Sequence, residues 1–154
     1  PAGASIHLGS FYHLPYAKRI IDTFRASETA DIDRVVMFQG LEGYDDIRPG
    51  STKVAVWNHG EEIDDFDIET PEYGMDFESE DLAVDDIAAE SAAITEAVLE
   101  GTREDRFADA VAVNAALRIY AGGDADDITA GLEIAHGAIE SGAAEERLEA
   151  LRNV

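Results

Sequence analysis

One short stretch constrains the fold more than any other: residues 34–47 read RVVMFQGLEGYDDI. The run at 34–38 is dominated by β-branched and aromatic residues, which predicts a short strand covered on both faces. Two glycines then bracket a tight loop, where glycine can adopt positive φ at little steric cost. Asp45 and Asp46 follow beyond the carboxyl end of this strand, where ligands collect in open parallel sheets. The stretch therefore predicts an α/β sheet with an acidic ligand site at the end of a buried strand.

Position distinguishes this aspartate pair from the other three, which occur at 64–65, 85–86 and 126–127. Those three lie on an expected hairpin or near expected helix starts, where solvated surface is the simplest interpretation. Only Asp45 and Asp46 follow an apolar strand and a glycine loop. Two carboxylates on such a loop suit Mg²⁺, which prefers hard oxygen ligands and is commonly held together with substrate phosphates. Asp45 and Asp46 are therefore the predicted metal ligands.

The charge of the chain is far from balanced. Lys and Arg total 11 against 34 Asp and Glu, for a formal net charge of -23. Because the acid is spread along the chain, we interpret it as halophilic adaptation to a salt-filled cytosol. An acidic DNA mimic or a cation-binding surface is the alternative. No basic stripe exists to neutralise phosphates, so nucleic-acid binding by this segment is not expected.

The bulk composition bounds the class of protein. With 154 residues, 45% of them hydrophobic, the chain can bury the core of one globular domain. No apolar run approaches the ~20 residues that would span a membrane, and no signal-peptide pattern opens the sequence at Pro1. The absence of cysteine excludes disulfides and thiolate sites, which fits a cytoplasmic protein.

The remaining sequence predicts a sheet followed by helices. A strand at 5–9, an amphipathic helix at 14–24 and the strand at 35–38 indicate a βαβ unit with a parallel strand pair. A hairpin follows, with strands at 54–57 and 63–68 around a turn at 58–60, so the sheet is mixed. We expect one unit over 1–154, in which residues 1–70 hold the strands and crossover helix. Its helical part spans 80–154, with helices predicted at 87–98, 106–120 and 128–139 and a last short helix carrying Leu148 and Leu151.

Other polar motifs have simple structural interpretations. Gly122-Gly123-Asp124 lies between two helices with no strand before it, which predicts a helix C-cap followed by an N-cap aspartate, not a phosphate loop. Asn114 and Arg118, one turn apart on the helix expected to be most buried, predict a satisfied internal polar pair. None of the scattered histidines shows metal-ligand spacing, and His13, just ahead of a helix, is interpreted as local structure.

Several segments, in order along the whole chain, resemble the C-terminal part of anthranilate phosphoribosyltransferase. Pro1-Ala2-Gly3-Ala4 is similar to the end of that family's "NPAGA" segment, and residues 36–47 (VMFQGLEGYDDI) to its "VVHGxxGLDEI" stretch. Residues 71–75 (PEYGM) resemble "PEDFGL". Residues 114–117 and 141–148 match its closing helices. The combination is specific, although no single piece is.

The resemblance implies a phosphoribosyltransferase/nucleoside-phosphorylase-like α/β fold: a mixed, mainly parallel sheet with a β-hairpin, followed by a cluster of C-terminal helices. It implies an enzyme that transfers phosphoribose from PRPP to anthranilate in tryptophan synthesis, with its Mg²⁺-binding acidic pair on Asp45 and Asp46. The family's PRPP-binding glycine loop, anthranilate contacts and dimerising helices lie upstream of the part that matches Pro1. We therefore expect a C-terminal portion of a homodimeric enzyme, carrying half of a metal site and inactive alone.

Two departures from the family pattern leave alternatives open. The histidine of the family's "HG" is Gln39 here, and its second acid is Asp46 instead of glutamate. In this respect the chain looks closer to a paralogous branch of the same fold, which implies a different acceptor or a non-catalytic role in binding nucleotides or nucleic acid. The third possibility is a scaffold whose acidic loop binds nothing.

The acid excess makes a direct prediction about salt. Repulsion among acidic side chains weakens the fold in dilute buffer, and molar salt screens it to a range of roughly 3 Å. We expect the melting temperature, followed by circular dichroism, to rise between dilute buffer and molar KCl. A melting temperature that stays constant or falls would contradict halophilic adaptation.

Overall fold

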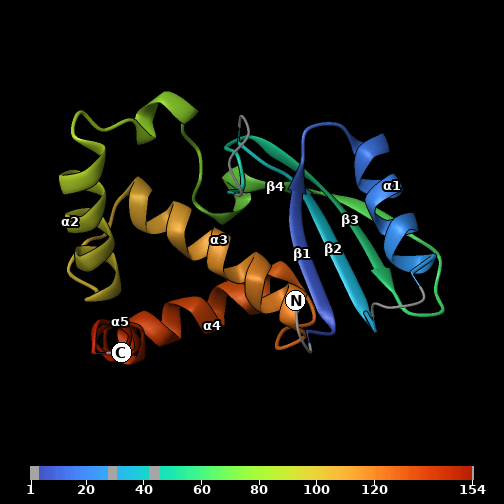
Figure 1. Cartoon of the computed structure of the whole chain (residues 1–154). Coiled ribbons are helices and arrows are strands. Elements are labelled where there is room, and N and C mark those ends of the chain that lie inside the picture. The colour runs from blue at the N-terminus through green and yellow to red at the C-terminus, as the bar shows by residue number, and fades with distance from the viewer. Residues whose placement is uncertain (1–3, 28–30, 42–45, 154) are drawn as a thin grey trace.

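The computed structural model describes residues 4–27, 31–41 and 46–153. Strands fill the first part of the chain and helices the last, in the order shown in Figure 1. The strands are β1 (Ile6–Phe11), β2 (Arg34–Gln39), β3 (Ser51–Asn58) and β4 (Asp64–Glu69). The α-helices are α1 (Leu14–Arg25), α2 (Ile87–Leu99), α3 (Arg106–Gly122), α4 (Ile128–Glu140) and α5 (Ala143–Arg152), and 3₁₀ turns occupy η1 (Thr70–Tyr73) and η2 (Ser79–Leu82).

The four strands form one mixed sheet in the order β1-β2-β3-β4. β1 and β2 are parallel and joined through α1, and β3 and β4 form the predicted hairpin. The predicted fold class, an α/β unit with a mixed sheet followed by helices, is confirmed. The expectation of a mainly parallel sheet is wrong for the described strands, because β2–β3 and β3–β4 are both antiparallel. Their connections are too short for the helical crossover that a parallel pair needs.

Helices cover both faces of the sheet. Alternate residues of β2 and β3 point to opposite faces, so each strand contributes to two cores. The core under α3 contains Val36, Phe38, Val54, Val56, Ile68, Val113, Ala116 and Leu117. The core under α1 contains Val35, Met37, Ala55, Trp57, Ala17 and Ile21. This double coverage explains why residues 35–38 of β2 are all apolar.

Aspartates cap the start of three helices, and a glycine ends one of them. The side chains of Asp86, Asp105 and Asp127 accept the first-turn N–H groups of α2, α3 and α4. Gly123 ends α3 in a left-handed conformation, as predicted. The prediction that Asp124 caps the next helix is wrong. The chain makes a further short turn before α4, and that turn brings Asp127 to the N-cap position.

The buried surfaces of the helices differ. α3 buries more residues than any other helix of the described chain, as predicted. The helix predicted at 87–98 is present as α2, but Val98 is its only buried residue and Ile87 is 75% exposed. The reason is visible in Figure 1: α2 lies beyond β1, where it packs mainly on α3 and α5 instead of covering strands.

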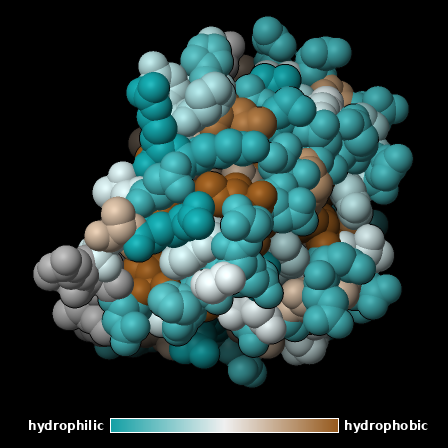
Figure 2. Space-filling model, turned by 90° about the vertical axis from the view of Figure 1, so that its right-hand side faces the viewer, coloured by the Kyte–Doolittle hydropathy of each residue, from teal (hydrophilic) through white to brown (hydrophobic). Residues whose placement is uncertain are grey.

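The surface on the α1 side is dominated by polar side chains. Figure 2 shows that hydrophobic residues appear on this face only in small patches between hydrophilic ones. None of the described helices combines the length and the apolar composition needed to cross a membrane.

Close packing of α3 on α4 gives a stability prediction. A Cβ atom on Gly131 would lie 2.7 Å from the backbone oxygen of Ala116, closer than real Cβ contacts allow. Gly131→Ala should therefore force the helices apart and lower the free energy of unfolding by about 1–3 kcal/mol in urea titrations. Gly137→Ala is the matched control, because nothing lies within 4 Å of its Cβ position on the same helix.

The control should stabilise the protein by about 0.5–1 kcal/mol, because alanine loses less backbone freedom than glycine in a helix. Equal effects of the two substitutions would show that the contact at Gly131 does not limit the packing of α3 on α4.

Candidate ligand site at the carboxyl end of the sheet

The loop after β2 closes on itself and on β1. The Leu41 N–H donates to the backbone oxygen of Asp46 at 2.9 Å, and Gly40 and Ile47 form an antiparallel bridge. The Gly40 N–H also donates to the Phe11 oxygen at the end of β1, at 3.2 Å. Asp46 therefore lies at the base of the loop, beyond the carboxyl ends of the parallel pair, as predicted. Asp45, the other predicted ligand, lies outside the described residues.

Helix α3 anchors this loop through Asn114. The Ile47 N–H donates to Asn114 Oδ1 at 2.9 Å, and Asn114 Nδ2 donates to the Ala110 oxygen at 2.9 Å. Both polar ends of the amide are therefore satisfied, and one of them fixes the residue next to Asp46. Ile47 is 1% exposed, so its N–H group has no route to bulk water as a substitute.

Arg118 joins the same contact. Its Nη1 donates to the Asn114 oxygen at 2.9 Å and to Asn114 Oδ1 at 3.3 Å, so the predicted bonding between the two residues is confirmed. The pair is not internal as predicted, because Arg118 Nη2 also lies 3.6 Å from Asp46 Oδ1, with side chains 46% and 59% exposed. An exposed ion pair of this length contributes little stability. The pair matters for its position, because it places the Arg118 cation of α3 beside the Asp46 carboxylate at the end of the loop.

Two hollows flank the loop. The first, here called the α3 cleft, has a volume of about 500 Å³ and is apolar except at the end formed by Asp46, Asn114 and Arg118. Its other lining residues are Leu41, Ile47, Leu82, Ile94, Phe107, Ala110, Val111 and Ala115. The second, the β1 pocket, has a volume of about 290 Å³ and is lined by Tyr12, His13, Gln39, Gly40, Leu41, Arg48, Pro49 and Ser79.

The β1 pocket contains residues that sequence reasoning left out of the site. Gln39 Nε2 donates to the Tyr12 oxygen at 3.3 Å, which joins the ends of β1 and β2. His13 occupies the N-cap position of α1 without capping it, and its ring stacks with Tyr16 at 6.3 Å. A signal existed in the sequence, because these residues lie at or just after the ends of the two strands that a parallel pair brings together.

The metal ligands that the chain offers around Asp46 match one kind of metal site. Within the described ranges, no three His, Cys, Asp or Glu side chains group closely enough to hold a metal ion. A closed cage of protein ligands is therefore absent from this part of the chain. A single exposed carboxylate on a loop does fit Mg²⁺, which keeps several waters and is usually held by one or two carboxylates together with phosphate oxygens.

A separate hollow of about 350 Å³ lies between α3 and α4. Asp109 and His136 both line it, and burial raises the pKa of the Asp109 carboxyl, with nearby His136 acting in the opposite direction. Burial also lowers the pKa of His7 on β1, whose ring lies 4.6 Å from that of Phe24. Neither group contributes to the loop after β2, so the candidate site remains the loop and its two hollows.

An α/β sheet with an acidic loop beyond the carboxyl end of a parallel pair is the arrangement in which α/β domains commonly bind ligands. Comparison with known families agrees: "Glycosyl transferase family, a/b domain" matches residues 1–145. The chain belongs to this family.

Relatives agree with the family. The chain is 30% identical over 150 residues to anthranilate phosphoribosyltransferase of Rubrobacter xylanophilus, covering 97% of this chain and 43% of the relative. It is 32% identical over 158 residues to that of Geobacillus stearothermophilus, covering 99% and 44%. The resemblance found in the sequence is confirmed. The chain spans less than half the length of these relatives.

Solved structures share the fold. Anthranilate phosphoribosyltransferase from Thermus thermophilus has a TM-score of 0.61 at 27% identity, covering 75% of this chain and 34% of that one. The Saccharomyces cerevisiae enzyme in complex with 4-fluoroanthranilate has a TM-score of 0.71 at 20% identity, covering 93% and 41%. A variant of the latter enzyme, with Mg bound, has a TM-score of 0.70 at 21% identity, again covering 93% and 41%.

The anchoring of the loop can be tested by stability. Asn114→Ala removes the acceptor of the buried Ile47 N–H and should lower the free energy of unfolding by about 1–3 kcal/mol in urea titrations. Thr95→Ala is the control, because it removes an exposed side-chain bond to the Ser91 oxygen within α2. The control should change stability by no more than ~0.5 kcal/mol. A loss no larger than that of the control would contradict the anchoring role of Asn114.

Proposed function

We propose that this chain is part of a Mg²⁺-dependent phosphoribosyltransferase that transfers phosphoribose from PRPP to anthranilate, as in tryptophan synthesis. The observation that carries the proposal is the position of Asp46 at the carboxyl end of the sheet, in a chain that belongs to the glycosyl transferase family. Relatives that match nearly the whole chain are named anthranilate phosphoribosyltransferases, which supports the choice of donor and acceptor.

In this proposal Asp45 and Asp46 hold Mg²⁺ jointly with the pyrophosphate of PRPP. The bound metal would offset the negative charge that develops on the leaving pyrophosphate. Asp46 suits this role because its side chain is 59% exposed and its contact with Arg118 is loose, at 3.6 Å. A tightly bonded carboxylate would not be available to a metal ion.

Two neighbouring side chains hold the loop and orient the Asp46 carboxylate. Asn114 fixes the backbone next to Asp46, and Arg118 places a guanidinium beside the same carboxylate. That cation attracts phosphate oxygens from the open end of the α3 cleft.

A related transferase with a different acceptor is the second candidate. Gln39 stands where the resembled family has a histidine, and its amide bonds the Tyr12 oxygen at the floor of the β1 pocket. An acceptor contacting this pocket would therefore meet an amide in place of an imidazole. Nucleic acid is a poor partner for this segment, because its net charge of -23 repels phosphates.

The test measures loss of anthranilate fluorescence on addition of PRPP and Mg²⁺ in molar KCl, with the protein expressed from the whole gene that encodes this chain. Asp46→Asn should lower kcat/KM on the order of a hundredfold, and the double change Asp45→Asn/Asp46→Asn should lower it further. Asp22→Asn is the control, because Asp22 is 62% exposed and pairs with Arg25 at 3.2 Å, away from the loop.

The outcomes separate the candidates. Turnover that collapses with Asp46→Asn and survives Asp22→Asn supports the proposal. A folded wild-type protein that does not consume anthranilate rejects it in favour of another acceptor. This chain by itself should not turn over the two substrates, because its sequence has no glycine-rich phosphate loop between a strand and a helix.

A further inference from the structure

The β1 pocket differs in charge from the other hollows of the structure. Its described lining residues include one arginine and no aspartate or glutamate. By contrast, Asp46 lines the α3 cleft, and Asp109 lines the hollow between α3 and α4. Two further hollows contain Asp22 and Glu90. In a chain with 34 acidic residues, a hollow that combines a cation with no described carboxylate favours a negatively charged ligand.

Arg48 supplies the positive charge of the pocket. Its Nε donates to the Ser51 backbone oxygen at 2.9 Å, at the start of β3. Among the described residues, no carboxylate lies within ion-pair distance of Arg48, whereas both lysines pair with aspartates. The guanidinium is therefore fixed through Nε, and its two terminal amino groups keep their donors for another partner.

Two neutral side chains add donors to the same pocket. The Gln39 amide uses one of its hydrogens for the Tyr12 oxygen at 3.3 Å, so the second remains for a ligand. Ser79, at the start of η2, is half-buried and contributes a hydroxyl group. The pocket thus combines guanidinium, amide and hydroxyl donors, and phosphate oxygens accept hydrogen bonds from all three.

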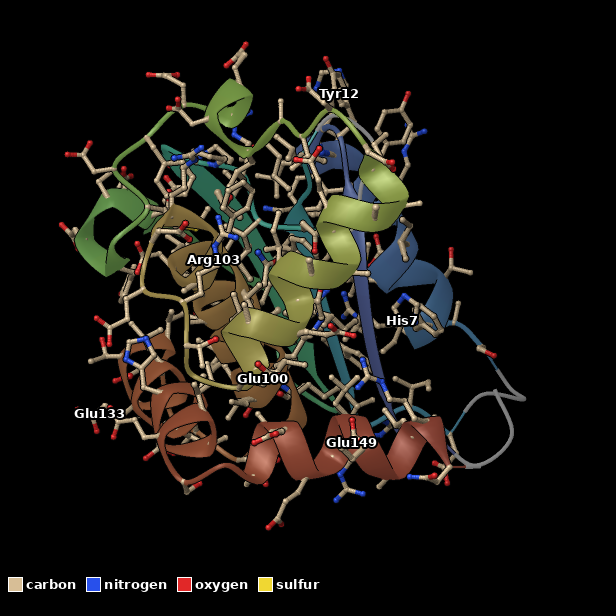
Figure 3. All side chains as sticks on the ribbon, turned by 90° about the vertical axis from the view of Figure 1, so that its left-hand side faces the viewer. His7, Tyr12, Glu100, Arg103, Glu133 and Glu149 are labelled. Carbon is tan, nitrogen blue, oxygen red and sulfur yellow. The ribbon has the colours of Figure 1, made fainter. Side chains whose placement is uncertain are left out.

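The start of α1 adds to the same field. His13, the N-cap residue of α1, lines the pocket, and its side chain does not cap the helix. The first turn of α1 contains no acidic residue, unlike the first turns of α2, α3 and α5. Figure 3 shows Tyr12 at the end of β1, just before this helix begins. The positive end of the helix dipole therefore reinforces the charge of Arg48.

We propose that the β1 pocket binds the phosphate group of a small molecule, with Arg48 as its charged contact and Gln39 and Ser79 as neutral donors. This site differs from the proposed Mg²⁺ site, because Asp46 is not among its lining residues. A volume of about 290 Å³ lies at the small end of the range for ligand pockets, which suits a phosphate group and part of the molecule that carries it.

The net charge of -23 does not prevent binding of this kind. A nucleic acid must lay many phosphates along a surface on which carboxylates are spread. A single phosphate group contacts only the pocket, and molar salt limits repulsion from more distant carboxylates to a range of roughly 3 Å. The donors of the pocket therefore decide whether phosphate binds.

The inference deepens the proposed function, since a phosphorylated donor would bring such a group to this end of the sheet. The choice of a sugar phosphate as a probe rests on that function. Phosphate binding itself is measured without turnover and without metal, so the two proposals can fail separately.

The experiment follows the Arg48 Nε–H signal by heteronuclear NMR, in the protein expressed from the whole gene, in molar KCl with EDTA to remove Mg²⁺. The bond to the Ser51 oxygen shields this proton from exchange with water, and loss of the signal in Arg48→Gln assigns it. Inorganic phosphate and ribose 5-phosphate should both shift the signal to saturation. Tighter binding of ribose 5-phosphate would show that the pocket also accepts the sugar.

Two matched variants place the site. Ser79→Asp puts a carboxylate into the pocket and should weaken phosphate binding by about tenfold. Ser91→Asp makes the same change at an exposed position of α2 and should leave phosphate binding unchanged. Circular dichroism of each variant checks that the fold is retained.

Three results would overturn the proposal. One is an Arg48 signal that neither phosphate nor ribose 5-phosphate shifts. Another is equal weakening of binding by Ser79→Asp and Ser91→Asp. The third is an equal shift with benzoate at the same concentration, because the pocket would then not distinguish phosphate from a carboxylate. A protein that binds phosphate as expected but does not consume anthranilate would reject the proposed function and support this inference.

Discussion

The packing of α3 against the sheet is the interaction on which the rest of this structure depends. The C-terminal half of the helix buries Val113, Ala116 and Leu117 against β2 and β3, and this contact fixes the direction of the whole helix. Because the helix is rigid, the same contact also places Asn114 and Arg118 beside the loop after β2. The core and the candidate site are therefore not independent. Any change that rotates α3 on the sheet moves the groups that hold Asp46.

Local patterns were sufficient to predict most of the elements. The β-branched run of β2 and the helical spacing of α3 both gave the right element type, because each is buried as its pattern implies. The pattern of α2 was equally regular, yet most of its residues are exposed. Periodicity reports which residues share a face, but it does not report what lies opposite that face. The aspartate caps show a similar limit, since the number of turn residues before α4 has no strong local signal.

The position of the acidic loop could be predicted, but its supports could not. A carboxylate after an apolar strand and a glycine turn has a recognisable local sequence. The bond from Ile47 to Asn114 joins positions 67 residues apart, and nothing in either segment specifies the other. What the sequence offers is a weaker signal: an asparagine and an arginine one turn apart on an otherwise apolar helix. Such a pair needs polar partners, and here the partners are the loop.

The acid excess makes the difference between the two edges of the described sheet informative, because β4 carries four acidic residues and β1 carries none. On an ordinary protein, an edge strand without acidic side chains would be one feature among many. Here carboxylates are spread along the chain, and the charges on β4 close the opposite edge of the sheet. Long-range repulsion between acidic surfaces opposes random association, and molar salt removes only its long-range part. Short-range desolvation of carboxylates still penalises a contact on the acidic faces. Carboxylates on β4 therefore raise the cost of contact at that edge of the sheet, and β1 carries no such charge.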